Sequence, residues 1–155
     1  MPDFWGEYEC TIDAKGRLRL PTSLLKDLEL SDDKKFVINR GFEKCLMLYP
    51  IFFWQIIKKA VDQLNFFDEN DRAFMRYFYR GASNIELDAS DRMLIQKQLQ
   101  EYAGLDKEVI LFAYNNRIEI WDKATYDGVM DVPPSQFSAT AQRVLGNAMK
   151  IIPAP

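Results

Sequence analysis

The sequence has no histidine among its 155 residues and only two cysteines. Without histidine, the Ser-His-Asp and Cys-His nucleophile arrangements are excluded, and a transition-metal site is disfavoured. Cys10 and Cys45 lie too far apart in sequence to have metal-ligand spacing, so we expect two reduced thiols. A P-loop and a dinucleotide-binding fingerprint are also missing. These absences favour a protein without a metal or a cofactor. They leave an enzyme as a third class of function, which would need a pocket with perturbed carboxylates, but nothing in the sequence points to one, and we expect none.

Long apolar runs are missing as well. No uninterrupted run approaches the roughly 20 residues that a membrane helix needs. The N-terminus is acidic and lacks a basic stretch followed by an apolar one, so we expect no signal peptide and a cytoplasmic protein. The acidic residues Asp68, Glu69 and Asp71 lack the spacing and the glycine of an EF-hand, and they favour a helix N-terminus instead.

The composition is that of a soluble globular protein, with 48% hydrophobic, 28% charged and 14% aromatic residues. The net charge of −3 at first disfavours DNA binding. Global charge is a poor guide when a binding face is small, because the local field matters there. The distribution of charge along the chain is therefore the relevant quantity.

The chain contains two copies of one pattern. Residues 11–20 align with residues 86–95 at an offset of 75, and both contain an apolar residue, Asp, Ala, two variable residues, Arg and a strand-like run. A later strand pattern at residues 45–49 recurs at residues 117–121, with an offset of 72. Two ordered matches with three residues of drift indicate an internal repeat.

Within the first copy, Leu18 and Leu20 alternate with Arg17 and Arg19. The period of two places the leucines on one face of a strand and the arginines on the other. Residues 13–16 fit a tight turn, because aspartate bonds to nearby backbone amides and glycine accepts positive φ.

Other elements follow from periodicity and from turn residues. Arg72, Arg76 and Arg80 form a stripe on one predicted helix, either a solvated face paired with acids or a contact for phosphates or another subunit. Residues 151–155 are expected to be a loose tail. We expect strands at 36–38, 45–49, 109–111 and 117–121, and helices after Pro21 (capped by Thr22 or Ser23), from Pro50 to Leu64, at 70–80, at 123–130, and at 139–149 (capped by Ser138).

Several short motifs occur in a fixed order along the chain. They are residues 6–8, 11–18, 40–42, 46–50, 81–82, 86–88, 101–105 and 116–121. In this series the sequence resembles the MraZ family over nearly its whole length. The resemblance implies a β-rich α+β fold of two tandem AbrB-like swapped-hairpin (double-split β-barrel) units, with helices between and after them. The expected division is a first repeat at 1–50, inter-repeat helices at 51–82, a second repeat at 83–131 and a C-terminal helix and tail at 132–155.

The resemblance also implies a function. It implies a sequence-specific, double-stranded-DNA-binding transcriptional regulator that represses a division and cell-wall gene cluster through short tandem boxes upstream of its own gene. It implies a ring-shaped homo-oligomer and association with the nucleoid. The Asp-x-x-x-Arg motifs of the family form its DNA surface. The expected DNA-binding residues are Asp13, Lys15, Arg17, Arg19, Asp88 and Arg92.

The two copies differ at one position in the motif. The family frame has glycine before the arginine, as at Gly16, whereas the second copy has Asp91. Residues 14–26 have a local charge of +4 and residues 88–98 a local charge of 0. We therefore expect the first copy to be the better DNA face. For Arg92 two roles stay open: contact with DNA, or an ion pair with Asp88 or Asp91.

A second class of function competes with DNA binding. AbrB-like units also serve as protein-interaction or antitoxin-type oligomerisation modules, and the aromatic helices at residues 50–80 offer a partner surface. A disordered toxin-binding tail would favour this alternative, and the short C-terminus does not resemble one.

Overall fold

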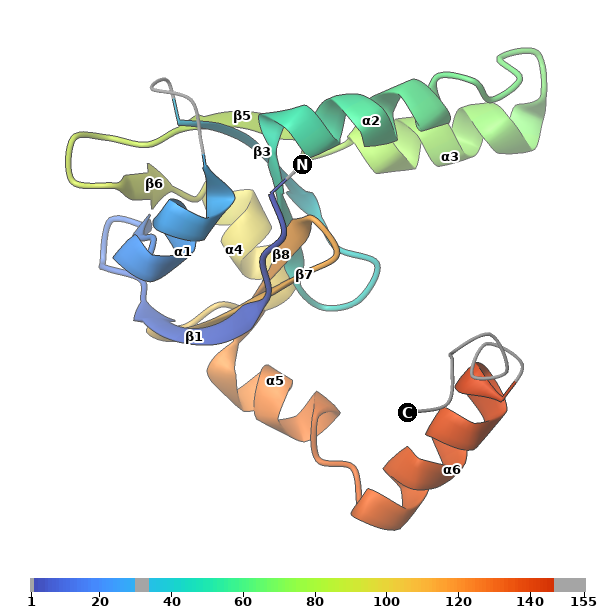
Figure 1. The fold of residues 1–155 in the computed structure, drawn as a ribbon. Helices are drawn as coiled ribbons and strands as arrows, with labels where there is room; N and C mark the ends of the chain where they lie inside the picture. Colours follow the sequence, from blue (N-terminus) through green and yellow to red (C-terminus); the bar gives the residue numbers. More distant parts are fainter. Residues whose placement is uncertain (1, 30–33, 147–155) are drawn as a thin grey trace.

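The computed structural model describes residues 2–29 and 34–146. Within these ranges, pairs of strands alternate along the chain with one or two helices (Figure 1). In chain order they are β1 (Gly6–Thr11), β2 (Arg17–Arg19), α1 (Thr22–Leu28), β3 (Lys35–Arg40), β4 (Leu46–Pro50), α2 (Ile51–Val61), α3 (Glu69–Tyr79), β5 (Ser83–Glu86), β6 (Arg92–Leu94), α4 (Lys97–Ala103), β7 (Glu108–Tyr114), β8 (Arg117–Asp122), α5 (Lys123–Val129) and α6 (Pro134–Leu145).

The strands form two antiparallel sheets in which the two repeats are interleaved. The larger sheet has the order β1-β7-β8-β4-β3-β5, and β2 pairs with β6 in a separate two-stranded ribbon. The first strand of each repeat therefore pairs with a strand of the other repeat, β1 with β7 and β5 with β3. The order is the same when the two repeats are exchanged, so the fold has an approximate two-fold symmetry. Each repeat depends on the other to complete its sheet.

The structure confirms a mixed α/β fold with two tandem repeats, which is the coarser part of the expected fold class. The helices contain more residues than the strands, so the term β-rich fits the core and not the whole chain. Strand pairing among the described residues leaves an open six-stranded sheet and a ribbon, and closes no barrel. The division at 1–50, 51–82, 83–131 and 132–155 stays a prediction.

The large sheet is buried on both faces, which explains the continuous apolar runs of its central strands. One face, with Phe36, Leu46 and Leu111, packs against the leucines of β2, α1 and α4 in the main core. The other face is covered in two places. Trp54 of α2 packs over β3 and β4, and Tyr126 of α5 packs over β7 and β8.

The predicted elements are confirmed with small shifts of their bounds, except for the start of the last helix and for two predicted helix caps. Helix α1 begins after Pro21, but neither Thr22 nor Ser23 caps it with a side chain. Helix α6 begins at Pro134, earlier than the predicted residue 139, because proline fits the first helical position. Ser138 is therefore inside this helix and not its cap. The predicted end of this helix at residue 149 and the tail at 151–155 lie outside the described residues.

Helices α2 and α3 lie side by side and extend away from the sheets (Figure 1). The rings of Trp54 and Phe78 stack at 5.6 Å, and Tyr79 donates a 2.6 Å hydrogen bond to Asp62. Asp68 caps α3 by accepting the amide of Asp71 at 2.9 Å, as predicted for the acidic cluster. Ion pairs among the described residues do not include the arginine stripe of α3.

Candidate nucleic-acid interface

The Asp13 side chain organises the turn before β2. Its Oδ1 accepts the backbone amides of Lys15 and Arg17, each at 2.9 Å. Its Oδ2 accepts Nε–H of the Arg17 guanidinium, also at 2.9 Å. The Gly16 amide closes the turn on the Asp13 carbonyl at 3.0 Å. The backbone amide of Arg17 is the main reason that the pKa of Asp13 lies below its usual value, so the carboxylate stays ionised at neutral pH.

The second repeat reproduces this turn atom for atom. Asp88 Oδ1 accepts the amides of Ser90 at 2.8 Å and Arg92 at 3.0 Å. Its Oδ2 accepts Nε–H of Arg92 at 3.0 Å, and the backbone amide of Arg92 lowers the pKa of Asp88. The side chains of Arg17 and Arg92 are both 33% exposed. The open question about Arg92 is thus answered in part, because it forms an ion pair with Asp88 and not with Asp91.

Each motif arginine keeps its terminal nitrogens available. A guanidinium carries five N–H donors, and the carboxylate takes only the one on Nε. Within the described part of the chain, the terminal nitrogens of Arg17 and Arg92 have no hydrogen-bond partner. The carboxylate holds the group through Nε and takes neither terminal nitrogen. Such a preorganised fork can donate two parallel hydrogen bonds to a planar acceptor.

Strands β2 and β6 place both motifs on one ribbon. Leu18 lies opposite Met93 in the antiparallel register, and both side chains are buried. The alternation predicted for β2 is therefore confirmed, and Arg17 and Arg19 lie on the other face. On that outward face Arg19 is paired with Arg92. The two repeats contribute to a single surface, which we call the ribbon face. Its residues are Asp13, Lys15, Arg17, Arg19, Asp88, Asp91, Arg92 and Leu94, joined by Lys34 at its edge.

Asp91 takes the left-handed conformation that Gly16 takes in the first repeat. Its φ is +59°, close to the +81° of Gly16. The turn therefore survives, at some conformational cost for a residue with a Cβ. A Cβ at Gly16 would lie 3.0 Å from the Ile95 carbonyl oxygen and 2.5 Å from Nε2 of Gln100, so the first repeat requires glycine here.

The charge of Asp91 is balanced by a residue from a distant part of the chain. Lys34 Nζ lies 2.6 Å from Asp91 Oδ1. Counting Asp13 with residues 14–26 gives a charge of +3, and counting Lys34 with residues 88–98 gives +1. The predicted contrast between the two repeats therefore keeps its direction and becomes smaller.

Comparison with known proteins also divides the chain into two copies of one unit. The family model described as "MraZ protein, putative antitoxin-like" matches residues 4–77 and again residues 78–147. The chain belongs to the MraZ family. It is 40% identical to the transcriptional regulator MraZ of Christiangramia forsetii, over 95% of this chain and 96% of the relative. It is 39% identical to the transcriptional regulator MraZ of Cytophaga hutchinsonii, over 97% and 99% of the two chains.

Two residues of the ribbon face in this MraZ-family chain were missed by the sequence reasoning. Lys34 is 57 residues away from Asp91, so no local pattern could pair them. Leu94 aligns with Arg19, and alternation from the buried Met93 would have placed it outward. The structure brings all six predicted site residues together, on the two turns and the ribbon that joins them.

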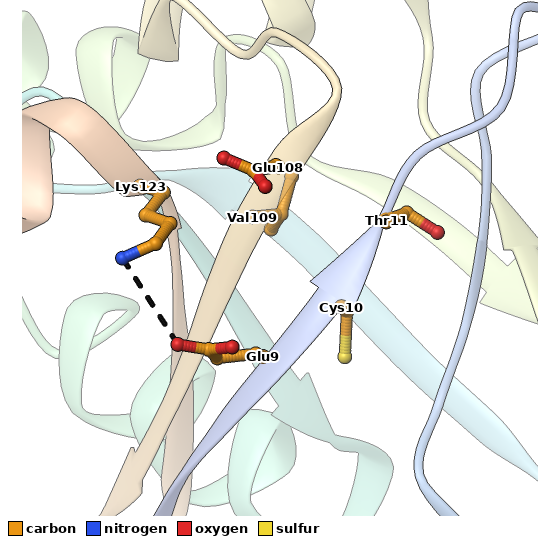
Figure 2. Close-up of a pocket in the computed structure, with 6 residues that line it drawn as sticks. All are labelled: Glu9, Cys10, Thr11, Glu108, Val109 and Lys123. Carbon is orange, nitrogen blue, oxygen red and sulfur yellow. Dashed lines mark ion pairs between the residues drawn. The ribbon is translucent and has the colours of Figure 1, made fainter.

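Other features of the chain offer little reactive chemistry. A pocket of about 330 Å³ lies between β1, β7 and α5, where Lys123 is 4.0 Å from Glu9 (Figure 2). Glu108 also lines it, so carboxylates outnumber cations there and phosphate is disfavoured. Burial raises the pKa of the Cys10 thiol in this pocket to about 11 and that of Cys45 to about 12. Both thiols are therefore protonated and weakly nucleophilic at neutral pH.

The described residues contain neither a metal-binding cluster nor a membrane-spanning helix. No cluster of three or more Cys, Asp or Glu side chains among the described residues is placed to hold a metal ion. In the same part of the chain, every helix is too short or too polar to span a bilayer.

Proposed function

We propose that the chain is a sequence-specific, DNA-binding transcriptional regulator and that the ribbon face is its DNA-binding surface. One observation carries the proposal. The Asp-x-x-x-Arg turns of both repeats converge on a single antiparallel ribbon and present their guanidinium groups outward. The naming of its relatives as transcriptional regulators supports the same role.

The shape of the ribbon suits the major groove of B-DNA, which is about 12 Å wide and admits a two-stranded β-ribbon. The terminal nitrogens of Arg17 and Arg92 match the N7 and O6 acceptors of guanine. Lys15 and Arg19 are exposed, and their cationic side chains are suited to contacts with phosphates. Asp13 and Asp88 act as positioning residues, since their carboxylates already bind the arginines.

The charge of the ribbon face also favours DNA. It carries five cations against three carboxylates, whereas the whole chain has a net charge of −3. A positive face on an acidic molecule orients the protein toward the polyanion. Binding will weaken steeply as salt rises, because each neutralised phosphate releases counterions.

We propose three finer features on the basis of the family resemblance. The exchange of first strands between the repeats corresponds to the swapped-hairpin arrangement of AbrB-like proteins. The DNA targets are short tandem boxes upstream of its own gene, where binding represses a division and cell-wall gene cluster. The protein works at the nucleoid in the cytoplasm and has no catalytic role.

We further propose that several chains assemble into a ring. Large apolar side chains are exposed in the loop between α2 and α3, where Phe66 is 67% and Phe67 90% exposed, and on α6, where Phe137 is 71% exposed. Such side chains are typical of subunit contacts. A ring would present several ribbon faces to consecutive boxes. Each contact after the first would form at high effective concentration.

The experiment is a titration of fluorescent DNA from the region upstream of the gene, preceded by footprinting on that region. Arg17→Ala should weaken binding by about fivefold or more, because a bidentate arginine–guanine contact is lost. Arg143→Ala removes the same charge from exposed α6 and serves as the matched control. No footprint, or equal losses for the two variants, would overturn the proposal.

The alternative function is an antitoxin-type interaction module, which the family description favours. It predicts a stable complex with a second protein and no footprint on the upstream DNA. The footprint distinguishes the two functions, and light scattering coupled to size exclusion on purified protein tests the ring. A ring gives a multiple of the 18.1 kDa chain mass without any partner, and a monomer that binds DNA equally well would remove the ring from the account.

A further inference from the structure

Besides the turn positions Lys15/Ser90 and Gly16/Asp91, the ribbon face departs from two-fold symmetry at one position within its strands. Residue 19 of the first repeat corresponds to residue 94 of the second, at the offset of 75. The first is an arginine and the second is a leucine. Leu94 is 58% exposed and lies directly opposite Arg17 in the ribbon. The approximate symmetry therefore places an apolar side chain where the other half has a cation.

Packing does not account for this leucine. Its neighbours Met93 and Ile95 are each 1% exposed and fill the core beneath the ribbon. Leu94 points the opposite way, on the same face as Arg17 and Arg92. An isolated exposed leucine is common on protein surfaces. This one, however, lies on the ribbon face directly opposite Arg17, whose guanidinium is held in place by Asp13.

The chemistry of the major groove offers one apolar partner. Each base pair presents donors and acceptors there, and the C5-methyl group of thymine is the only apolar group on the edges. A leucine side chain that faces the groove would lose hydration without gain over any other base. Against a thymine methyl it buries apolar surface on both sides.

We infer that Leu94 is a specificity-determining residue that contacts a thymine methyl group next to the base bound by Arg17. This inference rests on the proposed function of the ribbon face. It also gives the protein a polarity on DNA. With Arg at both positions the two strands would present the same outward side chains in either direction, whereas one Arg and one Leu favour a single orientation, in addition to the difference between the two turns. Asymmetric recognition of this kind would align successive ribbon faces on boxes that repeat head to tail.

The test uses duplexes that the wild-type protein selects from a randomised library. The selected duplex is then synthesised with deoxyuridine in place of each thymine in turn, which removes one methyl group and nothing else. At one position this change should weaken wild-type binding by about fourfold, the value of one buried methyl group. Leu94→Ala should bind that duplex and its parent equally. Leu145→Ala, on exposed α6, should keep the wild-type pattern.

A second variant tests the same idea by changing the preference. Leu94→Arg restores the residue of the first repeat, and selection with this variant should replace the critical thymine by guanine. Selection that keeps thymine would overturn the inference. So would a uracil penalty that persists in Leu94→Ala, or the absence of any sensitive thymine.

The arms of the experiment separate this inference from the proposed function. If Arg17→Ala weakens binding and Leu94→Ala leaves the uracil pattern unchanged, only the role of Leu94 is wrong. If the wild-type protein selects no sequence, the DNA-binding function itself fails. Light scattering on Leu94→Ala covers one more outcome, because a fall in mass would place Leu94 in a subunit contact and overturn its role at DNA.

Discussion

Replacing Leu18 by alanine should damage the fold and not the chemistry of the DNA face. Leu18 is 0% exposed and lies opposite Met93, where the ribbon packs on the main core. Truncation of a fully buried leucine costs about 3 kcal/mol, of which a part is lost transfer energy and a part is the cavity left behind. For a chain of this size the same change lowers the melting temperature by about 6 to 12 °C.

The neighbouring residue provides the matched comparison. Arg17 points to solvent, so Arg17→Ala should leave the unfolding midpoint nearly unchanged and should weaken DNA binding instead. Urea unfolding followed by the fluorescence of the buried Trp54 and Trp121 measures stability at one fixed protein concentration. If Arg17→Ala destabilises the protein as much as Leu18→Ala does, then Arg17 does not lie on the outward face of β2 as described.

Three further predictions follow from the same geometry. Arg92→Ala should weaken DNA binding by about fivefold or more, though less than Arg17→Ala, and wild-type affinity in a titration would contradict a shared face. Alkylation of Cys10 by iodoacetamide should accelerate about tenfold per pH unit between pH 8 and pH 10, because its raised pKa of about 11 keeps the thiol mostly protonated there; a rate that levels off by pH 10 would indicate an ordinary thiol. Duplexes with several boxes should bind about 100-fold tighter than one box, and equal affinities would remove the avidity mechanism.

The local features of the site could be predicted because their causes are local. Asp13 contacts residues only two and four positions away, so the turn was evident from residue types and spacing. The alternation of Leu18 with Arg17 likewise fixes which side chain is buried, once the strand itself is accepted. The repeat then transferred both conclusions to Asp88 and Arg92.

The long-range features could not be predicted in the same way. Nothing in the order of the strands indicates that β1 pairs with β7 or that β2 meets β6, because these partners belong to different repeats. From the sequence alone, the two motifs are therefore expected to form two separate faces, each with its own local charge. The ion pair between Lys34 and Asp91 has the same origin, since tertiary structure alone brings the two residues together.

Photo-crosslinking from the two turns is the most direct test of DNA contact by the ribbon face. Ala14 and Ala89 are exposed, occupy equivalent positions in the two turns and make none of the contacts that hold the arginines. Each is replaced in turn by a benzoylphenylalanine residue, and the same residue at Val129 on α5, 47% exposed, is the control. We predict crosslinks to the footprinted DNA from both turns and none from position 129. Crosslinks from position 129 alone, with DNA bound and both turns silent, would contradict DNA contact by the ribbon face.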